Sequence, residues 1–192
     1  MTATRPGVTP FRFTREQYYH LHNLDFFDGK RVERLRGEII EMSGVNWPHV
    51  VASRKTAILL EKLFSSTAWV NRCEQPIPTE DSDPQPDVMV IPGRFEDYND
   101  HPTTALLIVE VSDSTLFKDT TLKAEIYATA GVQDYWVIDG ENRQLHVFRD
   151  PVPLPQELGA TAYQSHVTLG ETDSVAPLAM SNQSIRVAEM LP

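Results

Sequence analysis

Two carboxylates lie in apolar, strand-like segments, where an ionised side chain is costly. Asp87 directly follows Pro86 and opens the apolar run at 87–91, and Glu110 stands between two valines in the run at 106–111. A charged carboxylate in such surroundings needs a cationic partner, a metal ion or a raised pKa. Taken singly, Asp87 also fits a strand-end cap, and Glu110 also fits an ion pair with a core-facing Arg or Lys.

Considered as a pair, the two carboxylates indicate a metal site. Asp87 begins one segment and Glu110 lies near the end of the next, so antiparallel pairing would bring both to the same edge of a sheet. Two anions at close range repel each other unless a cation lies between them, and oxygen-only ligands suit Mg²⁺ or Mn²⁺. Such an ion polarises a phosphoryl oxygen and lowers the pKa of a bound water. The chemistry expected is therefore hydrolysis of a phosphoester.

Lys123 is the third candidate. It is spaced i+4 from Asp119 and i−4 from Tyr127, so the three residues share one face of a helix. Spacing alone favours a surface Asp–Lys pair, worth about 0.3–0.5 kcal/mol. In the functional interpretation, the Lys123 ammonium leans over the two carboxylates. It would then orient the attacking water or neutralise the charge that builds on the phosphate.

The elements that must position these residues are helices and strands of an α/β (α+β) domain. Residues 32–42 predict an N-terminal β-hairpin with its turn at Arg36-Gly37, because glycine readily adopts a positive φ. The run at 106–111 is apolar on both faces, which is typical of a central strand. We expect further strands at 68–74, 87–91, 132–139, 144–149 and 163–169, a proline-rich loop at 76–86, helices at 14–24, 49–64 and 119–130, and a closing element at 185–191.

Length and composition predict one folded domain spanning residues 1–192. The core would occupy about 10–150, with peripheral elements at 151–192. The chain has 192 residues, 41% of them hydrophobic, and no apolar run of the roughly 18 residues that a membrane-spanning helix needs. The N-terminus lacks the apolar segment of a signal peptide. A single cysteine, Cys73, excludes an internal disulfide and a zinc site of several cysteines. We therefore expect a cytoplasmic protein.

The net charge of −10 argues against a protein whose main task is to grip a phosphate backbone. It does not exclude an enzyme that acts on nucleic acid, because a cluster of catalytic carboxylates is itself acidic and a local basic patch can coexist with it. Two alternatives stay open: a non-cleaving binding or regulatory module, and a metal-dependent hydrolase of another phosphoester.

Several motifs resemble those of the Uma2 family, whose members are assigned as restriction endonucleases. The resemblance covers roughly residues 10–190. It is carried by Pro86-Asp87-Val88, by the block from Glu110 to Asp139 with its Tyr135-Trp136 pair, and by the hairpin motif that starts at Glu33. The resemblance implies a restriction-endonuclease-like fold of the PD-(D/E)XK superfamily, with a mixed central β-sheet flanked by helices.

The resemblance also implies roles for individual residues. In the usual PD-(D/E)XK pattern the lysine stands two residues after the glutamate, a position held here by Ser112. In the Uma2-like pattern the lysine lies on the following helix, and Lys123 matches it. Asp87 and Glu110 would then be catalytic metal ligands for Mg²⁺ or Mn²⁺, and Lys123 would assist the chemistry.

Two supporting positions follow from the same resemblance. Glu33 matches an acid on the first hairpin that could add a metal ligand or hold a water, and His49 matches a position that could face the site. The implied partner is a nucleic acid, with DNA as the expected substrate. A homodimer is expected because cutting both strands of a duplex favours two sites.

Overall fold

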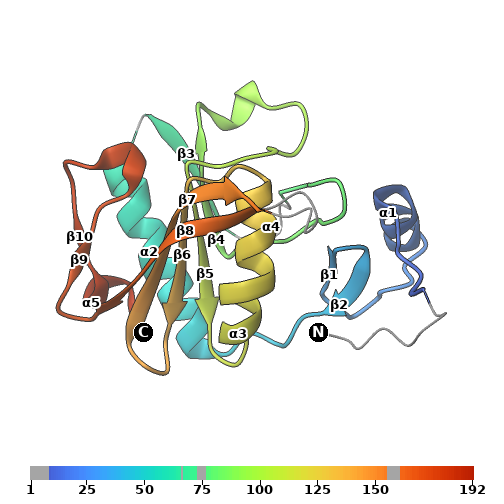
Figure 1. Cartoon of the computed structure of the whole chain (residues 1–192), viewed down its shortest axis with the longest axis horizontal. Coiled ribbons are helices and arrows are strands. Elements are labelled where there is room, and N and C mark those ends of the chain that lie inside the picture. Colours follow the sequence, from blue (N-terminus) through green and yellow to red (C-terminus); the bar gives the residue numbers. More distant parts are fainter. Residues whose placement is uncertain (1–8, 66, 73–76, 155–160) are drawn as a thin grey trace.

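A mixed six-stranded sheet forms the centre of the protein, as the sequence predicts. The computed structural model describes residues 9–65, 67–72, 77–154 and 161–192 (Figure 1). The strand order is β3-β4-β5-β6-β7-β8, in which β5 and β6 are parallel and the other neighbours are antiparallel. The strands are β3 (Ala68–Arg72), β4 (Val88–Pro92), β5 (Leu107–Ser112), β6 (Asp134–Asp139), β7 (Gln144–Pro153) and β8 (Thr161–Gly170).

Helices cover both faces of this sheet (Figure 1). Alternate residues of β4 point to opposite sides, since Val88 and Val90 pack with α2 (Trp47–Phe64), whereas Met89 and Ile91 pack with α4 (Ala124–Thr129). The hydrophobic core on the α2 side of the sheet also includes residues of α5 (Val187–Met190). This helix follows the short strand pair β9 (Ser174–Val175) and β10 (Ile185–Arg186). None of the helices within the described residues is long and apolar enough to cross a bilayer.

The helical segment that carries Lys123 contains a π-helical turn. It begins with α3 (Leu116–Lys118), continues as a π-helix over Asp119–Lys123 (η2) and ends as α4. The segment starts three residues before the expected 119–130. It ends in a Schellman motif: Gly131 has a φ of 79°, and the Val132 N–H donates to the Tyr127 carbonyl at 3.0 Å.

Helix α2 begins at Trp47, two residues before the predicted start at 49. The Asn46 side chain accepts a hydrogen bond from the His49 N–H at 2.9 Å and so caps the helix. Pro48 lies inside the first turn instead of preceding the helix. Proline is tolerated there because its missing N–H would have no intrahelical partner.

The N-terminal hairpin lies beside the main sheet, next to helix α1 (Arg15–Asn23) (Figure 1). Strands β1 (Val32–Leu35) and β2 (Glu38–Glu41) are antiparallel. They are joined at Arg36 and Gly37, whose φ values of 50° and 73° fit a type I′ turn. The predicted hairpin is therefore confirmed. Strand β3 ends at Arg72, and the rest of the range predicted for it, including Cys73, lies outside the described residues.

The described part of the proline-rich segment is a loop, as predicted, and some of its side chains are buried in the protein. Ile77 and Asp83 are fully buried. The Asp83 carboxylate lies 2.7 Å from the Arg34 guanidinium, with both side chains 1% exposed, and it also accepts a hydrogen bond from Arg15 at 3.1 Å. This buried ion pair fastens the hairpin and α1 to the loop that leads into β4.

Replacing Asp83 with asparagine should therefore destabilise the protein, because the buried Arg34 guanidinium would lose its counter-charge. We expect Asp83→Asn to lower the free energy of unfolding by about 3 kcal/mol, measured by urea denaturation. The exposed neighbour Asp81 provides the matched control, and Asp81→Asn should have little effect. Equal unfolding midpoints for the two variants would contradict the assignment.

Candidate active site

The pairing of β4 with β5 brings Asp87 and Glu110 together. Val88 pairs with Val109 in an antiparallel register, so Asp87, one residue before, lies across from Glu110, one residue after. The Val111 N–H donates to Asp87 Oδ2 at 2.8 Å and fixes the orientation of that carboxylate. The antiparallel arrangement on which the sequence argument depended is confirmed.

Lys123, in the π-helical turn, extends its side chain to Glu110. Its Nζ donates to Glu110 Oε1 at 2.9 Å and lies 2.9 Å from Glu33 Oε1. The Lys123 side chain is only 1% exposed. The prediction of a surface ion pair between Lys123 and Asp119, which the spacing favoured, is wrong. Asp119 is also buried, and its carboxylate accepts hydrogen bonds from the Ser112 and Thr115 hydroxyls.

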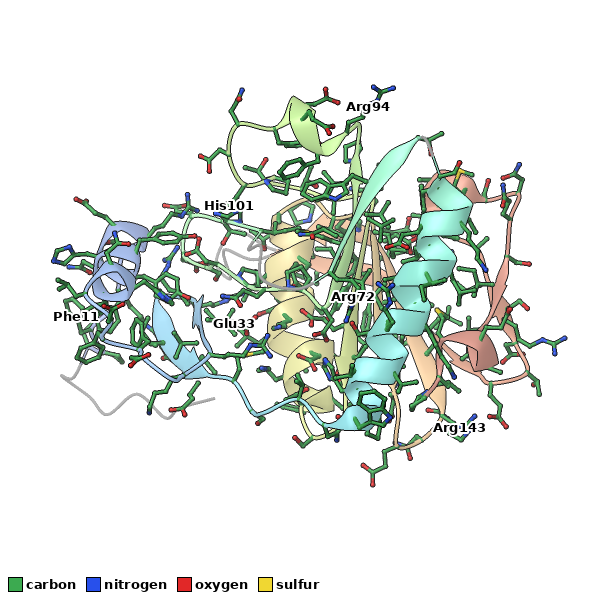
Figure 2. All side chains as sticks on the ribbon, turned by 180° about the vertical axis from the view of Figure 1, so that it is seen from behind. Phe11, Glu33, Arg72, Arg94, His101 and Arg143 are labelled. Carbon is green, nitrogen blue, oxygen red and sulfur yellow. The ribbon has the colours of Figure 1, made fainter. Side chains whose placement is uncertain are left out.

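Glu33 is supplied by β1 of the hairpin and is fully buried. It lies between the hairpin and the helical segment that carries Lys123 (Figure 2). The Gln85 N–H donates to Glu33 Oε1 at 2.7 Å, while Oε2 has no hydrogen-bond partner among the described residues. One side chain thus joins the hairpin to the loop before β4 and also holds Lys123.

His49, near the beginning of α2, contacts the other side of Asp87. Its Nε2 lies 2.9 Å from Asp87 Oδ1. Burial disfavours the charged form of both groups, but their mutual hydrogen bond and attraction outweigh it. As a result, the pKa of His49 is raised and the pKa of Asp87 is lowered. The lowered pKa keeps Asp87 ionised beside a histidine that can carry a positive charge.

The pKa of Glu110 shifts in the opposite direction to that of Asp87. Burial, together with repulsion from Asp87, Asp119 and Glu33, raises its pKa to about 8 although Lys123 opposes the shift. Burial lowers the pKa of Lys123, but Glu110, Glu33 and Asp119 together raise it well above its usual value. Lys123 is therefore the charged partner, and the surrounding carboxylates carry more negative charge than it can neutralise.

A pocket of about 60 Å³ opens onto these groups. Its lining includes Val45 and His49 from around the start of α2, and Thr115 and Lys118 from around α3. Asp87, Glu110 and Lys123 are among the residues that line it, together with Arg31, Met42, Ser43, Gly44, Val111, Asp113, Ser114 and Asp119. No three His, Cys, Asp or Glu side chains in the described parts of the chain form a ready-made metal site. The two carboxylates would thus be a partial oxygen-ligand set, completed by water or substrate.

Two residues that contribute to this site were not predicted from the sequence. The Tyr127 hydroxyl donates to Glu110 Oε1 at 2.6 Å, and Asp119 connects the end of β5 to the π-helical turn through Ser112. The spacing from Lys123 to Tyr127 was the available signal, because it placed both residues on one helix face. It gave no indication that this face turns toward Glu110.

Comparisons with known proteins agree with this architecture. The family model Uma2, described as "Putative restriction endonuclease", matches residues 15–188. A putative nuclease belonging to DUF820 from Anabaena variabilis ATCC 29413 has a similar crystal structure. The TM-score is 0.67, with 17% sequence identity over 94% of this chain and 97% of that one. A comparison with curated proteins found no match. The structural likeness confirms the predicted fold.

The raised pKa of Glu110 predicts how stability depends on pH. Its value of about 8 in the folded protein exceeds its ordinary value of 4.5. The stabilisation from this group is therefore complete below about pH 4.5 and is lost as the pH rises through about 8. In metal-free buffer, the Glu110→Gln variant should not lose stability in this way. At pH 8 its free energy of unfolding should exceed that of the wild type by about 2 kcal/mol, or roughly 4–8 °C in Tm.

Thermal unfolding in EDTA between about pH 5 and pH 8 would measure the effect. The control is Glu171→Gln, the same substitution at an exposed surface ion pair, which should leave the slope of Tm against pH unchanged. Parallel slopes for the wild type and Glu110→Gln would show that Glu110 does not titrate in this range.

Proposed function

Because the chain belongs to the Uma2 family, we propose that it is a metal-dependent endonuclease that hydrolyses phosphodiester bonds of DNA. The observation that carries the proposal is the buried Lys123 ammonium, held 2.9 Å from both Glu110 and Glu33 beside a pocket that Asp87 also lines. Strongly shifted pKa values and a fixed ammonium in one pocket are typical of a catalytic site.

The carboxylates fit a divalent cation of the Mg²⁺ or Mn²⁺ type. Asp87 and Glu110 offer only oxygen ligands, and a cation would offset the burial and the neighbouring acids that raise the pKa of Glu110. Two protein carboxylates leave room for water and phosphate oxygens. When bound, such an ion would activate a water and polarise the phosphate.

The remaining roles belong to the chain's own side chains. Lys123 would stabilise the negative charge that develops on the phosphate. Glu33 and Tyr127 act as positioning residues: Glu33 holds the Lys123 ammonium, and Tyr127 fixes Oε1 of Glu110, leaving Oε2 for the cation. His49 would orient Asp87 through its hydrogen bond to Oδ1. A homodimer, which would present two such pockets to the two strands of a duplex, belongs to the same proposal.

Removing either proposed metal ligand should abolish cleavage while the protein stays folded. We expect Asp87→Asn and Glu110→Gln each to reduce nicking of supercoiled plasmid by about 10³-fold or more with Mg²⁺ or Mn²⁺. Glu171→Gln is the matched control and should cut like the wild type. A wild-type protein that binds DNA but never cuts it with either metal would instead favour a non-cleaving module.

Lys123 needs a different design because its removal leaves two buried acids without a cation. We expect Lys123→Met to lose both cleavage and about 3 kcal/mol of stability. Adding Glu33→Gln should restore most of the stability, since one buried charge disappears, but no cleavage. Urea unfolding and plasmid nicking measured on the same preparations separate the two effects. A double variant that regains full cleavage would remove Lys123 from the mechanism.

A further inference from the structure

Two exposed aromatic side chains are neighbours in sequence of residues that line the candidate active site. Trp47 is 75% exposed and lies at the start of α2, between Val45 and His49, which both line the pocket. Phe117 is 81% exposed and precedes Lys118, which also lines the pocket. The beginnings of α2 and α3 lie at the same end of the sheet (Figure 1).

These two rings differ from the other strongly exposed aromatics. Phe11, Phe26 and Phe95 are more than half exposed, but each contacts another ring, with centroid distances of 5.0, 5.3 and 5.1 Å. Trp47 and Phe117 have no such ring contact within the described residues. An exposed aromatic ring beside a pocket offers a flat face on which a nucleic-acid base can stack.

Positive charge accompanies the rings. Arg31 and Lys118 line the pocket, and in the described part of the chain neither forms an ion pair with a carboxylate. Lys118 also lines an adjoining groove of about 890 Å³ that Phe117 borders. In the groove, Arg12 and Arg36 are already paired with Glu38 and Glu125. Of the two cations available to a phosphate, Lys118 thus lies where the groove meets the pocket, next in sequence to Phe117, and Arg31 lies within the pocket.

We propose that Trp47 and Phe117 stack against unpaired bases of the substrate, so that the nucleic acid is single-stranded or locally unpaired at the scissile phosphate. The inference rests on the proposed function and specifies its substrate. An intact duplex presents only base edges to a protein, whereas an unpaired base exposes the flat face that an aromatic ring can cover. The unpaired cations that line the pocket suit the phosphates that connect such bases, even though the chain as a whole is acidic.

Direct binding measurements test this inference without cleavage. The probe is fluorescein-labelled oligodeoxythymidylate of about 20 nucleotides, followed by anisotropy in EDTA or Ca²⁺, with a blunt duplex of the same length for comparison. We expect tighter binding of the single strand. Trp47→Ala and Phe117→Ala should each weaken it by about 5- to 150-fold while hardly changing duplex binding.

Phe95→Ala is the matched control, because Phe95 is an exposed aromatic that lines neither the pocket nor the groove. Intrinsic fluorescence gives a second readout, since Trp136 is fully buried and Trp47 is 75% exposed. Stacking should quench emission in the wild type and not in Trp47→Ala. Equal single-strand affinity in the wild type, Trp47→Ala and Phe117→Ala would overturn the inference.

The outcomes also separate this inference from the proposed function. If plasmid cleavage depends on Glu110 but neither ring affects binding, the protein is a nuclease with another substrate preference, and base stacking is rejected. Single-strand binding that depends on both rings, without any cleavage, would retain the inference and reject the enzyme. If the substitutions instead convert a dimer into monomers in sedimentation experiments, the rings contact a second copy of the chain, and base stacking is rejected.

Discussion

The ion pairs of the buried Lys123 ammonium are the constraint on which the rest of the site depends. Glu33 comes from the hairpin, Glu110 from the central strand β5, and Lys123 from the π-helical turn, so one cation connects three separate elements. A charge that is 1% exposed is tolerable only while its partners stay in place. The interaction therefore couples the position of the hairpin to the geometry of the pocket, and the buried pair of Arg34 with Asp83 reinforces the same docking.

The local charge balance shows that the site is not arranged for maximum stability. Burial and three neighbouring acids raise the pKa of Glu110 to about 8, which means that folding disfavours its ionised form. A protein selected for stability alone would place an amide or an apolar side chain there. The retained repulsion is reasonable if a cation relieves it during the reaction. The electrostatic repulsion in the site and its proposed chemistry would then have the same cause, which is the excess of carboxylates around one lysine.

Sequence reasoning located Asp87 and Glu110 because strand patterning is a local property, and an acid among valines is conspicuous. It also predicted the hairpin turn at Arg36-Gly37 and where the central strands lie in the sequence. It misjudged Lys123, since helical spacing shows which residues share a face but not what that face packs against, and the partner Glu33 is remote in sequence. The burial of Asp83 was missed for the same reason: a proline-rich loop has no periodicity that would reveal its long-range contact with Arg34.

The acidity of the chain is the observation hardest to reconcile with a nuclease, and the geometry of the site resolves much of it. Asp87, Glu110, Glu33 and Asp119 are buried around the pocket, so part of the net charge of −10 belongs to the proposed chemistry and not to the outer surface. Phosphate binding would fall to a few unpaired cations near the pocket. Such a surface would hold a long duplex weakly, because affinity for duplex DNA grows with the number of phosphates neutralised. A substrate held partly by its base faces has a weaker requirement for positive charge, so the acidic composition and the exposed rings favour the same, partly unpaired, nucleic acid.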